Sequence, residues 1–96
     1  MHDWTLLSLR IDWESGEVSI LIRGPKSENE ILASGALEIH IPRALPWGRS
    51  VSINAVAGPT IVENGLSSLD IEMQSGDTIK IVARSFNIPN AVRNPG

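Results

Sequence analysis

The stretch LDIEMQSGDTIKI (residues 69–81) decides the fold class. Apolar and polar residues alternate on both sides of its centre, as they do in a β-strand with one buried face. The centre reads Gln74-Ser75-Gly76, and a three-residue loop with glycine in the left-handed position is a common hairpin connection. This loop predicts two apolar pairs on the core face and one charged pair on the outer face: Ile71–Ile79, Leu69–Ile81 and Asp70–Lys80.

The same alternation recurs along most of the chain. Four further runs carry apolar residues at every second position, and we expect these to face the core: Leu7, Leu9, Ile11 and Trp13; Val18, Ile20 and Ile22; Ile31, Ala33, Leu37, Ile39 and Ile41; Val51, Ile53 and Ala55. No run has the spacing of a helix. The sequence therefore predicts an all-β protein, an antiparallel β-sandwich or open barrel of six to seven strands.

The turns between these runs predict how the strands pair. A four-residue loop over residues 14–17 pairs Trp13 with Val18 and places this tryptophan in the core. Within the third run, Gly35 indicates a bulge or a point of close packing.

A third hairpin is predicted at Asn64-Gly65, which is a strong two-residue turn signal. This turn pairs Thr60 with Leu69, so the preceding strand should bury even-numbered residues, whereas Ile53 is odd-numbered. A bulge at Gly58-Pro59 would reconcile the two faces. The alternative is an irregular loop over residues 56–66.

Length and composition favour a single domain. We expect one β domain over residues 1–86 and a flexible tail over residues 87–96, where two prolines and three asparagines interrupt the alternation. No internal repeat is evident. The core must be mainly aliphatic because aromatic residues make up only 4% of the 96 residues.

The charge and the residue types argue against several classes of protein. The net charge of −3 and a pI near 5.2 lack the basic excess of a nucleic-acid-binding protein. The absence of cysteine excludes disulfides and thiol catalysis and suits a reducing compartment. Neither a signal peptide nor a bilayer-spanning apolar run is evident, so we expect a cytoplasmic protein that does not bind membranes.

Positive signs of enzymatic chemistry are lacking. His40 and Glu38 share the outer face of one expected strand, but a zinc site needs three or four ligands. Asp12, Glu14 and Glu17 cluster around the first turn without the spacing of a calcium loop. We therefore predict no catalytic residue, no metal ligand and no cofactor. A small metal-binding or enzymatic domain is kept as an alternative.

A candidate binding site lies between the third and fourth runs, in the proline-rich residues 42–49. Two prolines stiffen this loop. It presents residue types that are enriched at protein–protein interfaces, and the predicted binding residues are Arg43, Leu45, Trp47 and Arg49. The alternative is that Trp47 folds inward and belongs to the core.

The blocks DWTLLSLRIDWESGEVSI, PWGRSVSIN and IEMQSGDTIKI resemble a family of short, uncharacterised bacterial proteins. The resemblance implies a bacterial, cytoplasmic, β-rich domain and no established activity. Our prediction is a non-enzymatic binding module with a protein partner, or self-association through an edge strand. An alternative, by analogy of size and acidic charge alone, is an immunity protein that neutralises a toxin.

Overall fold

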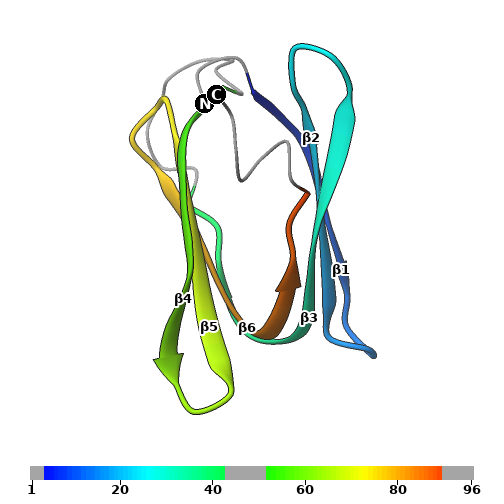
Figure 1. Cartoon of the computed structure of the whole chain (residues 1–96), viewed down its shortest axis with the longest axis vertical. Helices are drawn as coiled ribbons and strands as arrows, with labels where there is room; N and C mark the ends of the chain where they lie inside the picture. Colours follow the sequence, from blue (N-terminus) through cyan, green and yellow to red (C-terminus); the bar gives the residue numbers. More distant parts are fainter. Residues whose placement is uncertain (1–3, 43–51, 90–96) are drawn as a thin grey trace.

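The computed structural model describes residues 4–42 and 52–89 of the chain. These residues form six strands and no helix: β1 (Thr5–Asp12), β2 (Glu17–Arg23), β3 (Glu28–His40), β4 (Ile53–Glu63), β5 (Leu66–Met73) and β6 (Thr78–Asn87). All neighbours are antiparallel, in the order β1-β2-β3-β6-β5-β4. The sheet curls into an open half-barrel (Figure 1), which confirms the predicted all-β fold and its open-barrel form.

The two central strands, β3 and β6, give the sheet its curl. The first part of β3 pairs with β2, and its second part pairs with β6. Gly35 lies between these parts with a φ of +66°, and the β3–β6 register shifts between Ala36 and Glu38. A Cβ atom on Gly35 would lie 2.9 Å from Cδ of Arg84, so the predicted close-packing role of this glycine is confirmed. The bend brings the β1–β2 half opposite the β4–β5 half (Figure 1).

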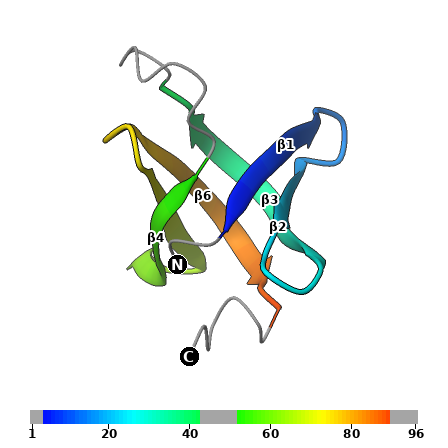
Figure 2. The same ribbon diagram turned by 90° about the horizontal axis from the view of Figure 1, so that it is seen from above.

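The strand order is symmetric about the β3–β6 pair. Each half of the chain is a three-stranded meander whose third strand pairs with the third strand of the other half. Ala36 pairs with Ala83 in this seam, and the first strands of the two halves meet at an isolated bridge between Thr5 and Ser52. The structure is thus approximately two-fold symmetric in topology (Figure 2), although no repeat is evident in the sequence.

The outermost strands, β1 and β4, touch only near their beginnings. Next to the Thr5–Ser52 bridge, the backbone N–H of Ile53 donates a hydrogen bond of 2.9 Å to the carbonyl of Trp4. Beyond this contact the two strands diverge (Figure 2). The half-barrel is therefore joined at one point, and β1 and β4 are its edge strands.

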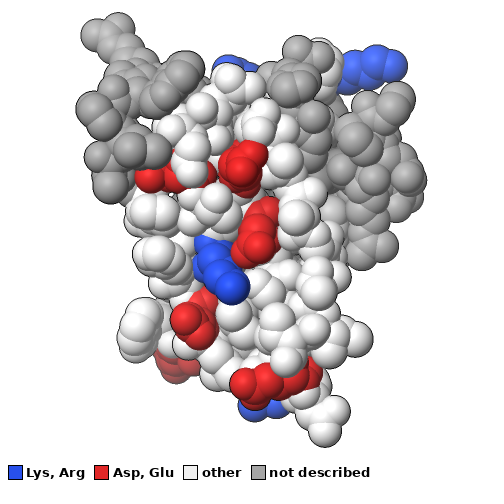
Figure 3. All heavy atoms as spheres, turned by 90° about the vertical axis from the view of Figure 1, so that its left-hand side faces the viewer, with Lys and Arg blue, Asp and Glu red and all other residues white. Residues whose placement is uncertain are grey.

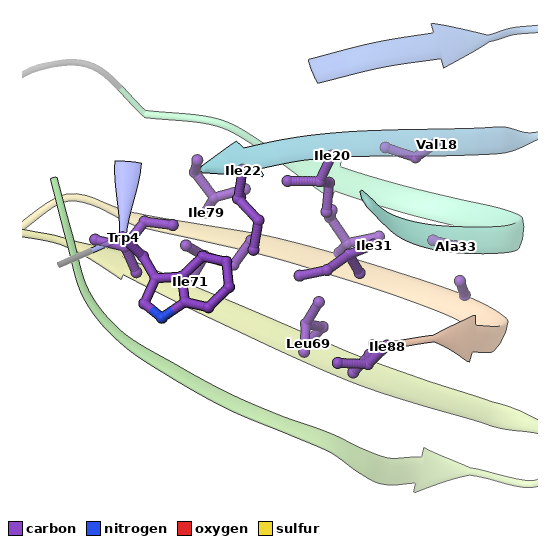
Figure 4. Packing of buried hydrophobic residues seen from close by; sticks show 13 residues of the cluster. Trp4, Val18, Ile20, Ile22, Ile31, Ala33, Leu69, Ile71, Ile79 and Ile88 are labelled. Carbon is purple, nitrogen blue, oxygen red and sulfur yellow. The ribbon is translucent and has the colours of Figure 1, made fainter. Parts of the chain in front are cut away.

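A mainly aliphatic core fills the space between the two halves (Figure 4). It comprises thirteen buried residues: Trp4, Val18, Ile20, Ile22, Ile31, Ala33, Ile53, Leu69, Ile71, Ile79, Ile81, Ala83 and Ile88. Each fully buried isoleucine stabilises the fold by about 1.5–3 kcal/mol relative to an exposed one. The predicted core faces of β2, β5, β6 and the first part of β3 are confirmed.

The β5–β6 hairpin has the predicted register. Leu69 pairs with Ile81, Asp70 with Lys80 and Ile71 with Ile79. The N–H of Met73 donates to the carbonyl of Asp77 at 2.8 Å and closes the three-residue loop, in which Gly76 has a φ of +98°. The prediction is confirmed here because the loop length and the alternation of both strands agree.

The predicted register of the β1–β2 hairpin is wrong by two residues. Ile11, rather than Trp13, pairs with Val18, and the loop consists of residues 13–16. Hydrogen bonds to Asp12 explain the shift: its carbonyl accepts from Gly16 N at 2.9 Å and its Oδ1 accepts from Ser15 N at 3.2 Å. Trp13 consequently lies in the turn and is 89% exposed.

The β4–β5 hairpin confirms the predicted turn and bulge. Glu63 pairs with Leu66 across Asn64-Gly65, and the register shifts between Ala57 and Thr60, around Gly58-Pro59. The alternative of an irregular loop over residues 56–66 is therefore wrong. Additional shifts place Thr60 opposite Ser68 instead of Leu69 and turn Ala55 away from the core.

The C-terminal strand continues into the region expected to be a tail. β6 ends at Asn87, and Ile88 belongs to the buried core. Residues 90–96 lie outside the described residues.

Candidate functional site

The loop residues predicted from the sequence to bind a partner are Arg43, Leu45, Trp47 and Arg49. All four lie outside the described residues. Their role, and the orientation of Trp47, stay predictions.

The described residues contain a different candidate, an apolar groove between the tip of the β1–β2 hairpin and the second part of β3. Its volume is about 350 Å³. Eight residues line it, and Asp12 is the only charged one among them: Ile11, Asp12, Trp13, Gly16, Val18, Ala36, Leu37 and Ile39. We call this feature the hairpin groove.

A backbone contact holds the two walls of the hairpin groove together. The N–H of Ala36 donates a 2.8 Å hydrogen bond to the carbonyl of Gly16. Gly16 has a φ of +73°, and a Cβ atom there would lie 3.6 Å from the nitrogen of Ala36. Glycine is thus favoured here by the turn geometry, since a Cβ atom would make only an ordinary contact with β3.

The groove is exposed because β1 is an edge strand. Ile11 is opposite Val18, so its side chain is on the core face, yet it is 42% exposed because no further strand covers it. Leu37 falls in the register shift of β3 and is 62% exposed. Five residues expected in the core are exposed instead of buried: Leu7, Ile11, Trp13, Leu37 and Ile41.

Contiguous exposed apolar side chains of this kind typically mark an interaction surface in a soluble domain. The alternation in the sequence indicated that these residues are apolar and share a face. It contained no signal for which strand is outermost, and that property decides whether the face is covered.

Two strand edges border the hairpin groove. In the part of the chain that the structure describes, β1 has a partner only on its β2 side beyond Thr5. β3 loses its β2 partner after Ala33, and among the described residues the bond from Ala36 N to the Gly16 carbonyl is its next backbone hydrogen bond on that side. Both edges expose backbone donors and acceptors beside apolar side chains.

Acidic residues predominate around the groove. Asp12 lines it, and Glu14 and Glu17 belong to the same hairpin. The nearest basic residue along β1 is Arg10.

In the part of the chain that the structure describes, His40 and Glu38 have no third ligand beside them. His40 pairs with Lys80 across the β3–β6 seam, and Glu38 pairs with Val82. Within residues 4–42 and 52–89, no three histidine, aspartate or glutamate side chains are grouped so that they could hold a metal ion. The same residues include no helix with the length and hydropathy needed to cross a bilayer.

The outer face of the β4–β5 half is polar and of mixed charge. Acidic side chains are spread over it with basic ones among them (Figure 3). The amide of Asn54 donates a hydrogen bond to the carboxylate of Glu72 on this face. A second, smaller exposed apolar pair, Ile61 and Val62, lies near the end of β4.

Comparisons of the chain with protein-family models, with curated proteins and with solved structures give no match. The function is therefore argued from the geometry of the hairpin groove.

Proposed function

We propose that the chain is a non-enzymatic binding module that captures a protein partner in the hairpin groove. The observation that carries the proposal is the exposure of Trp13 beside Ile11 and Leu37 over an apolar cavity. Tryptophan is strongly enriched among the residues that dominate the affinity of protein interfaces. Trp13, at 89% exposure, has nearly its whole side chain available for burial by a partner, beside an apolar cavity that exists in the free chain.

Affinity capture from source cells tests the proposal. The intact chain serves as bait, beside a Trp13→Ala variant and an Ile61→Ala control that removes an exposed apolar side chain from the other hairpin. We expect a stoichiometric partner on the wild type and the control, and at least a tenfold loss on Trp13→Ala. Equal capture by all three baits would overturn the proposal.

The loop of residues 42–49 supplies a second contact in this proposal. Trp47→Ala should then preserve the fold, measured by circular dichroism, and weaken the capture of the same partner. Unfolding of this variant would instead assign Trp47 to the core and remove the loop from the interface.

An immunity function stays a prediction, and it would be one form of protein binding. Its distinguishing result is a phenotype: cells that lack the protein should become sensitive to a toxin from their own or neighbouring cells. Unchanged survival in competition would count against it.

A further inference from the structure

We propose that the hairpin groove takes one large apolar side chain from an extended peptide segment of the partner, and that basic residues flank this side chain. The inference deepens the proposed function and rests on it. It specifies the chemistry of the segment that is recognised.

The size of the groove limits what can enter it. Pockets that enclose small molecules have volumes of about 300–1,000 Å³, and the hairpin groove, at about 350 Å³, lies at the lower end of this range. One or two side chains fit such a space, whereas a folded surface or a helix does not. The lining, apolar except for Asp12, favours an aliphatic or aromatic side chain.

The two halves of the molecule differ in how an equivalent segment packs. An Ile-Pro pair follows both central strands: Ile41-Pro42 after β3 and Ile88-Pro89 after β6. Ile88 is 7% exposed and lies beside Leu69 in the core (Figure 4). Ile41, at the equivalent point of the first half, is 38% exposed and does not line the groove. The isoleucine after β6 is thus buried in the core, whereas the one after β3 is partly exposed and leaves the hairpin groove open.

Charge complementarity selects the residues that flank the apolar side chain. Asp12 lines the groove, and Glu14 and Glu17 belong to the same hairpin; we call these three residues the acidic rim. Among the basic residues nearby, Arg84 packs its aliphatic stem against Gly35. Lysine or arginine on both sides of the inserted residue would be attracted to the acidic rim, and acidic flanks would be repelled.

The same argument disfavours a second copy of this chain as the occupant. The most exposed aliphatic side chain elsewhere among the described residues is Ile61, in the β4–β5 hairpin that also contains Glu63. Inserting this hairpin into the groove of another copy would bring Glu63 toward the acidic rim. The unpaired edges of β1 and β3 supply backbone donors and acceptors for an extended segment, which is the usual way in which sheet edges bind peptides.

The test uses three synthetic peptides and titration followed by amide NMR shifts of the full chain. The first peptide has an isoleucine–proline centre with two lysines on each side. The second replaces isoleucine by alanine, and the third replaces the lysines by glutamates. We expect saturable shifts for residues 11–18 and 36–39 with the first peptide and about tenfold weaker binding of the second. The third should not bind, and binding of the first should weaken with added salt.

Variants of the protein locate the site. Trp13→Ala should weaken binding of the lysine-flanked peptide about tenfold, and Ile61→Ala should leave it unchanged. Asp12→Asn retains the oxygen that accepts from Ser15 N but removes the charge, so we expect about threefold weaker binding of this peptide only.

Each contrary outcome has a distinct meaning. If the three peptides bind equally or not at all while cellular capture still depends on Trp13, the peptide chemistry is wrong and the proposed function stands. If cellular capture is also unchanged by Trp13→Ala, both the peptide chemistry and the proposed function are wrong. If light scattering shows a dimer that Trp13→Ala dissociates, the occupant is a second copy and the peptide proposal is overturned.

Discussion

Trp4 and Trp13 lie at opposite ends of the range of solvent exposure. Trp4, at 6% exposure, belongs to the core, and its ring packs against Gly24 while its carbonyl accepts the bond from Ile53. Trp13 lies in the turn of the β1–β2 hairpin and contributes to the hairpin groove. Trp4 thus helps to join the two ends of the half-barrel, whereas Trp13 is available to a partner.

Alanine substitutions should separate these two roles. Trp4→Ala removes a buried ring and should lower the free energy of unfolding by about 3–5 kcal/mol. Trp13→Ala should change it by less than about 0.5 kcal/mol, because its side chain is exposed. Urea denaturation followed by circular dichroism measures both. A large loss for Trp13→Ala would show that this tryptophan supports the fold.

Gly24 tests the packing of Trp4 directly. A Cβ atom at this position would lie 2.7–2.9 Å from three carbons of the Trp4 ring, so Gly24→Ala should destabilise the protein by about 1–3 kcal/mol. In a Trp4→Ala background the clash is absent, and most of this cost should disappear. The four proteins form a double-mutant cycle, and additive costs would contradict the contact.

At the scale of the element, hairpins differ in how well the sequence predicts them. The β5–β6 hairpin is predicted correctly because loop length, glycine position and two alternating strands all require one register. The register of the β1–β2 hairpin is predicted wrongly, since hydrogen bonds to Asp12 select a loop that the alternation alone does not indicate. In β4, the Gly58-Pro59 bulge is predictable because the two faces conflict on either side of it.

The ends of β3 and β6 give a matched pair of variants. Ile88→Ala should cost about 2–5 kcal/mol because Ile88 is buried in the core. Ile41→Ala, at the equivalent and more exposed point after β3, should cost less than about 1 kcal/mol. Thermal and urea unfolding measure the difference. Equal costs would mean that the two halves do not differ in how they are closed.

At the scale of the whole molecule, the sequence predicts the fold class but not the hairpin groove. Strand number and core faces follow from local alternation, which each segment carries by itself. The groove depends on which strands are outermost and on where a curled sheet fails to close, and both properties arise from contacts between distant segments. Ile11 and Leu37 therefore look like core residues until the strand order is known.

The rates of amide hydrogen exchange should distinguish the inner strands from the edge strands. Amides in β2, β3, β5 and β6, which pair on both sides over much of their length, should be the most protected. Amides of β1 after Thr5 and of β4 after Ile53 should exchange faster, because these edge segments diverge and pair on one side only. Uniform protection across all six strands would indicate that a further segment covers the edges.

The seam between β3 and β6 also constrains the order of folding. Within each half, neighbouring strands are joined by short turns, and such hairpins form quickly. The seam and the Thr5–Ser52 bridge join residues about half the chain apart, and contacts of this kind form slowly because a long loop must be closed first. We therefore expect two nascent halves to assemble before they associate. During this interval the edges of β3 and β6, later joined to each other, can pair with those of a neighbouring chain, so slow refolding at high concentration should yield halves exchanged between molecules.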